Sequence, residues 1–102
     1  MRSTALRLWA VILVAGLVHS LPSNAATHHQ IMASKYLRTQ FCIEREVGQR
    51  WHERFDIPMR MNRWGISEPT VEGLSRGPAA LRKADERCRR ENEIDQEPRP
   101  LR

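Results

Sequence analysis

The residues of this sequence with the clearest chemical potential are its two cysteines, Cys42 and Cys88. Their wide separation matches no zinc-ligand or redox motif, and neither belongs to a C-x-x-C sequence. An even number of cysteines in a small exported protein is typical of a structural disulfide, and the N-terminus of this chain predicts export. We therefore predict a Cys42–Cys88 bridge, which would stabilise the fold by about 4 kcal/mol in the chain-entropy description of disulfides.

Two adjacent histidines, His28 and His29, suit copper if the chain is cut shortly before them. An imidazole at the third position of a free N-terminus can join the amine and two amides in a square-planar site for Cu(II) or Ni(II). Cleavage after Ala25 makes His28 the third residue, and cleavage after Ala26 makes His29 the third. The simpler interpretation is two ordinary polar residues in a mobile terminus.

A second group with possible chemistry is the segment that holds Met59, Arg60, Met61, Arg63 and Trp64. Its thioethers and aromatic face would suit Cu(I). Because this segment and the two histidines could both bind copper, we take copper binding as the alternative function. The bias toward Met, Arg and Trp is also typical of the energetic centres of protein interfaces. We favour this second interpretation and predict these five residues as the partner-binding site. A third possibility is that Trp64 and the methionines pack the domain's own core.

No set of residues indicates catalysis. His52 and Glu53 are adjacent, so on a helix their side chains point about 100° apart. Ser67 and Ser75 lack the G-x-S-x-G context of a nucleophile elbow. We therefore predict a protein that is not an enzyme and needs no cofactor.

The N-terminus has the three parts of a secretory signal peptide. Arg2 and Arg7 provide the positive charge, residues 8–18 form an apolar run, and Ser23 and Ala25 place small residues at a cleavage site. The apolar run is about half of the ~20 residues needed to span a bilayer. We predict a signal peptide over residues 1–25 and a mature chain without a transmembrane anchor, in the periplasm or secreted.

The mature region, residues 26–102, is predicted to be one small domain. Removal of Arg2 and Arg7 lowers the net charge of the chain from +5 to +3, and acidic residues alternate with basic ones throughout. A basic balance can indicate nucleic acid, but the export signal argues against that partner. An envelope protein or an anionic surface component fits the predicted compartment better.

A long helix is predicted from about Ile31 to Phe55, after a loose N-terminal segment over residues 26–30. Its apolar residues recur at spacings of three, four and seven, which is the pattern of an amphipathic helix. We call this set the apolar stripe: Met32, Tyr36, Ile43, Val47, Trp51 and Phe55. Pro58 prevents any continuation, because the residue before a proline is disfavoured in the α region.

A second helix is predicted from Pro78 to about Ile94, with Gly77 at the N-cap and Pro78 in the first turn. Its apolar face is thin, and its acidic and basic residues follow each other at i,i+4, which is typical of a solvated face. The pairs are Asp85–Arg89 and Glu86–Arg90, and the apolar residues are Leu81, Ala84 and Cys88. A proline-containing tail follows.

The connection over residues 56–77 is unusually apolar and carries several prolines and glycines. Ser67 and Pro69 are suited to the N-cap and first turn of a short third helix. On an ideal helix Cys42 lies about 150° from the centre of the apolar stripe, so the disulfide and the stripe face different neighbours. The sequence thus predicts an all-α hairpin of two long helices with one disulfide. We expect the connection to cover the stripe, and the alternative is that a partner docks on it.

Overall fold

The computed structural model describes residues 24–102, which form four helices and a pair of short strands. Most of the predicted signal peptide, residues 1–23, lies outside the described residues. Within residues 24–102, no helix combines the length and the apolar character that crossing a bilayer requires. The fold is mostly helical, as predicted, but the two strands mean that the all-α prediction was incomplete.

The first described helix, α2 (Asn24–Val47), is longer at its start and shorter at its end than predicted. Residues 26–30, which were expected to be loose, belong to it. The helix stops because Gly48 has a φ of 100°, a left-handed conformation that glycine adopts without strain. Arg54 folds back over this turn and donates hydrogen bonds to the carbonyl oxygens of Val47 and Gln49. A single helix from 31 to 55 was therefore a wrong prediction.

After the turn, the one-turn helix α3 (Trp51–Arg54) directs Trp51 into the core, where 3% of its surface is exposed. The chain then forms an antiparallel hairpin of β1 (Met59–Met61) and β2 (Ser67–Pro69). Met59 lies opposite Pro69, and Met61 lies opposite Ser67. These strands are too short to show a reliable alternation of apolar and polar residues, and Pro69 argues against a strand on sequence grounds.

The two remaining helices follow the hairpin directly. Helix α4 (Val71–Arg76) begins after Thr70, whose Oγ1 accepts a hydrogen bond from the Gly73 N–H at 2.9 Å. A short third helix is thus present, but Ser67 does not start it. Helix α5 (Ala79–Glu91) has Pro78 rather than Gly77 as its N-cap and ends three residues before Ile94.

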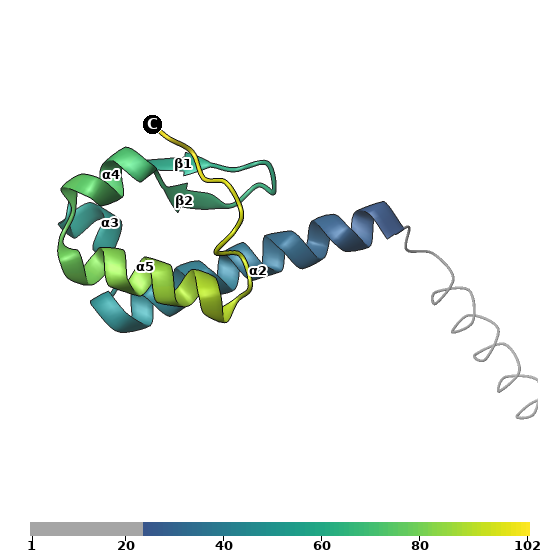
Figure 1. The fold of residues 1–102 in the computed structure, drawn as a ribbon, viewed down its shortest axis with the longest axis horizontal. Helices are drawn as coiled ribbons and strands as arrows, with labels where there is room; N and C mark the ends of the chain where they lie inside the picture. The colour runs from purple at the N-terminus through teal and green to yellow at the C-terminus, as the bar shows by residue number, and fades with distance from the viewer. Residues whose placement is uncertain (1–23) are drawn as a thin grey trace, which may run out of the picture.

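Helix α5 lies alongside the C-terminal half of α2, and the N-terminal half of α2 extends past it (Figure 1). The predicted disulfide is confirmed: Cys42 and Cys88 are bridged across these two helices, with their Cα atoms 5.8 Å apart. Around the bridge lies the main core, which is formed by Cys42, Ile43, Trp51, Ile57, Leu74, Leu81, Ala84 and Cys88. The thin apolar face predicted for the second helix is therefore buried.

A second, smaller cluster lies farther along α2 toward its N-terminus. Met32, Tyr36 and Ile94 are buried there, and Trp64 and Ile66 of the hairpin pack against them. The expectation that the connection covers the apolar stripe is confirmed for this part of the stripe. The C-terminal tail then crosses from the end of α5 to the start of α4, where the Val71 and Glu72 N–H groups donate to the carbonyl oxygens of Pro100 and Leu101.

Candidate docking surface

An open, largely apolar groove of about 730 Å³ lies between α2, α3 and the hairpin. Leu37 and Phe41 are one helical turn apart on α2, so they form one wall. Met59, Met61 and Ile66 of the hairpin line the other side. We call these five residues the apolar groove.

The apolar groove contains some of the most exposed apolar side chains in residues 27–102. Leu37 is 44% exposed, Phe41 51% and Met61 73%. Leu37 and Phe41 do not belong to the apolar stripe, so the periodicity that locates the core does not account for them. Contiguous exposed apolar surface of this kind is typical of a binding site, whereas single exposed apolar residues are normal.

The structure divides the five residues predicted to bind a partner between two places. Met59 and Met61 line the apolar groove, and Met59 also packs against the main core. Arg60 is exposed, and its Nε donates to the main-chain oxygen of Arg102 at 2.9 Å. Arg63 and Trp64 make contacts within the protein instead.

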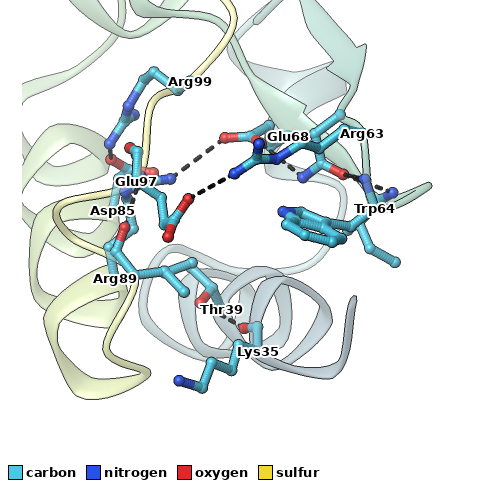
Figure 2. Close-up of polar contacts among 12 residues, drawn as sticks. Lys35, Thr39, Arg63, Trp64, Glu68, Asp85, Arg89, Glu97 and Arg99 are labelled. Carbon is cyan, nitrogen blue, oxygen red and sulfur yellow. Dashed lines mark hydrogen bonds and ion pairs between the residues drawn. The ribbon is translucent and has the colours of Figure 1, made fainter. Parts of the chain in front are cut away.

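Trp64 is half-buried over the second cluster, and the Arg63 guanidinium lies 4.7 Å from the centre of its ring. Arg63 also pairs with Glu97 of the tail at 3.2 Å (Figure 2). These contacts hold the hairpin against the tail and α2. Substitution of Trp64 would therefore alter packing as well as any surface that it offers.

Asn62 shapes the turn between the strands, and asparagine is typical of turns because its side-chain oxygen accepts a hydrogen bond from its own backbone two residues on. Its Oδ1 accepts hydrogen bonds from the N–H groups of Trp64 and Ile66, at 2.9 and 3.1 Å. Its Nδ2 donates to the Glu68 carboxylate at 2.7 Å. The amide thus fixes the loop that carries Trp64 and connects it to the buried charges beneath.

Two buried ion pairs lie between the hairpin, α5 and the tail (Figure 2). Arg89 approaches Glu68 at 3.3 Å, and both side chains are almost fully buried. Arg99 of the tail pairs with the buried Asp85 at 2.7 Å. Arg89 also donates to the carbonyl oxygens of Ile94 and Glu97, so it holds the tail in place.

The prediction that Asp85 and Arg89 form a solvated pair was therefore wrong. Asp85 is 40° from Leu81 around the helix and Arg89 is 40° further, so both continue the apolar face rather than oppose it. The sequence alone gives these angles. It does not show that Glu68 and Arg99, which come from distant segments, are the partners of Arg89 and Asp85.

Burial raises the pKa of the Glu68 carboxyl above its ordinary value. The hydrogen bond from Asn62 and the charge of Arg89 act in the opposite direction but have smaller effects. Burial likewise raises the pKa of Tyr36, whose ring lies near the Arg89 guanidinium. A shifted carboxyl can indicate an active site, but Glu68 is enclosed by Asn62 and Arg89 and does not line the apolar groove.

His28 and His29 are exposed residues of α2, and both rings lie edge-on to Trp64, with centroids 5.5 and 5.4 Å from it. The square-planar site would require this segment to leave the helix, because successive amide nitrogens of a helix do not point at one atom. Among the described residues, the only compact group of three His, Cys, Asp or Glu side chains is Cys42, Cys88 and Glu91. Its two sulfurs are already joined in the disulfide. Copper binding stays a prediction.

Comparison of the chain with protein-family models, with curated proteins and with solved structures finds no match. The chain is therefore described by its own geometry: a disulfide-linked helical pair, a hairpin fixed by buried charges, and an exposed apolar groove between them.

Proposed function

We propose that this chain is an exported, non-catalytic protein that binds another macromolecule of the cell envelope through the apolar groove. The observation that carries the proposal is the exposure of Leu37, Phe41 and Met61 around one continuous depression. Burying such side chains against a partner is favourable by roughly 25 cal/mol per Å² of apolar surface.

Export is part of the proposal, and it is supported by the signal-like N-terminus and by the disulfide. Structural disulfides persist in oxidising compartments and are rare in the cytosol. The expected mature N-terminus is Ala26 or Thr27. Intact-mass measurement on protein from its native source tests this, and recovery of the chain with Met1 still attached would contradict it.

Site-specific photo-crosslinking in intact cells tests the binding surface. A photoreactive phenylalanine analogue at Phe41 or at Met61 is expected to form an adduct of defined mass with an envelope component. The matched control is the same analogue at Val71, which is 41% exposed but lies away from the apolar groove. Equal or absent labelling at all three positions, with the protein folded and exported, would contradict the proposal.

A further inference from the structure

We propose that the partner segment bound in the apolar groove is an extended peptide that adds a strand to the outer edge of β1. We further propose that it carries an apolar–acidic–apolar pattern. This inference rests on the proposed function and names the chemistry of the partner.

Only alternate residues of β1 face β2. The Asn62 N–H donates to the Ile66 carbonyl, and the Thr70 N–H donates to the Pro58 carbonyl. In an antiparallel pair the hydrogen-bonded positions recur every two residues, so Arg60 is the residue of β1 that bonds to β2. The N–H and C=O groups of Met59 and Met61 therefore point away from β2.

These four backbone groups have no hydrogen-bond partner among the described residues. An edge strand with free donors and acceptors is a template for another strand, and addition of an extended peptide to such an edge is a recurrent mode of recognition. A helix in the same groove would leave the four groups unpaired.

Side chains at the same edge define the pattern of the peptide. Met59 and Met61 line the apolar groove, and Arg60 must point to the opposite face because side chains alternate along a strand. Peptide residues opposite the two methionines would share their face of the sheet, which is the face that lines the groove. Apolar residues fit there.

The charge of Arg60 determines which peptide residue fits between the two apolar ones. Arg60 is exposed and forms no ion pair with an Asp or Glu side chain of the described residues. A second copy of the chain that pairs along the full length of β1 would place Arg60 directly opposite Arg60, and like charges at directly opposite positions are destabilising. An acidic residue at this position of a different partner is instead favourable. Self-association is therefore the weaker fit, and an apolar–acidic–apolar segment is the stronger.

A random twelve-residue peptide library displayed on phage tests the inference on the intact, disulfide-bonded protein. Selected peptides are expected to share an apolar–Asp/Glu–apolar core. Selection on Arg60→Glu is expected to replace the acidic residue by Lys or Arg. Selection of apolar residues at i,i+3 and i,i+4 spacing would show a helical partner and overturn the inference. The inference would also be overturned if peptides selected on the wild-type protein showed no enrichment over those selected on Phe41→Ser.

A synthetic copy of the best peptide then tests the backbone pairing. Met61→Pro removes one outward N–H and, relative to Met61→Ala, which removes only the groove-lining side chain, is expected to weaken binding by up to about tenfold, the effect of losing one hydrogen bond. Ser67→Pro is the matched control, because Ser67 lies opposite Met61 and its N–H points from the other edge of the hairpin. If Met61→Pro fails to fold by circular dichroism, N-methylation of the peptide at its two apolar residues makes the same test.

The results separate this inference from the proposed function. Binding that is lost in Phe41→Ser, is weakened no more by Met61→Pro than by Met61→Ala, and is unchanged by peptide N-methylation would overturn strand addition and leave groove binding intact. Failure of the photo-crosslinking experiment, in contrast, would contradict the proposed function itself.

Discussion

The two ends of this molecule are held together by different physical means. Around Cys42 and Cys88, helices α2 and α5 share an apolar core and a covalent bridge. Around Glu68 and Arg89, the hairpin and the tail are held by buried charges, by Asn62 and by a small cluster of side chains. The first end requires only apolar residues of suitable size, whereas the second requires particular donors opposite particular acceptors.

The apolar groove depends on both ends of the molecule, because each end carries one of its walls. Leu37 and Phe41 are carried by α2, which the disulfide anchors to α5. Met61 and Ile66 are carried by the hairpin, which the buried charges position. Loss of either kind of contact would open the groove, but the two losses should differ in size and in pH dependence.

The largest effect is expected when the polar end is broken by Arg89→Glu. This change removes both the partner of Glu68 and the donor to the tail carbonyl groups. It also adds a second buried carboxylate. Removing one partner of a buried pair costs about 3–5 kcal/mol, and the added charge should bring the loss to the top of that range or beyond. Urea denaturation measures it. Arg90→Glu is the matched control, since Arg90 is exposed on the same helix and should change stability by less than about 0.5 kcal/mol.

The next largest effect is expected at the covalent end. The double variant Cys42→Ala with Cys88→Ala should lower the free energy of unfolding by about 4 kcal/mol, because the unfolded chain regains the freedom of a long loop. The native fold should persist at low temperature, since Leu81 and Ile43 keep the helices in contact. An unfolded double variant would show that the apolar core at this end is weaker than its burial suggests.

A smaller loss is expected for Asn62→Ala. It leaves the N–H groups of Trp64 and Ile66 without an acceptor and Glu68 without a donor, at a cost of about 1–3 kcal/mol. Asn92→Ala is the matched control at the C-terminus of α5, where the amide makes a single hydrogen bond to the Cys88 carbonyl. Equal losses in the two variants, measured by thermal denaturation, would contradict the special role of the hairpin turn.

The finest distinction between the two ends is their dependence on pH. A carboxyl whose pKa is raised on folding stabilises the folded state most below its unfolded pKa, and that contribution is lost as pH rises through the folded pKa. Relative to Glu68→Gln, the wild-type protein should therefore lose stability as pH rises from about the ordinary value of 4.5 toward the raised value, and then stay constant. Urea titrations of both proteins at several pH values measure the difference. A relative gain with rising pH would show that attraction to Arg89 outweighs burial.

Several features of the covalent end follow from the sequence alone. The apolar spacing of Met32, Tyr36 and Ile43 indicates the buried face of α2, and Leu81, Ala84 and Cys88 indicate that of α5, because helical periodicity is a local property. The parity of the cysteines and the predicted compartment led to the correct disulfide. Gly48 was visible as an interruption, but its left-handed conformation, which ends the helix, and the Arg54 side chain that closes the turn were seen only in the structure.

The polar end was decided by tertiary structure. Residues 59–69 contain a proline, a glycine and too few alternating positions for a pattern, so the hairpin forms because Asn62, Glu68 and the second cluster give it partners. The sequence shows Asp85 and Arg89 one helical turn apart, which by itself is typical of a surface pair. In the fold each side chain instead forms an ion pair with a distant segment. Asp85 pairs with Arg99, and Arg89 pairs with Glu68.

The candidate site shows the same division. Met59, Arg60 and Met61 could be selected by residue type, because Met and Arg are enriched where proteins bind each other. Leu37 and Phe41 could not, because a helix pattern does not tell which residues outside the apolar stripe a hairpin will approach. Local periodicity, cysteine parity and residue type were thus set by the sequence directly. The partners of buried charges and the neighbours of exposed apolar residues were set only by contacts between segments far apart in the chain.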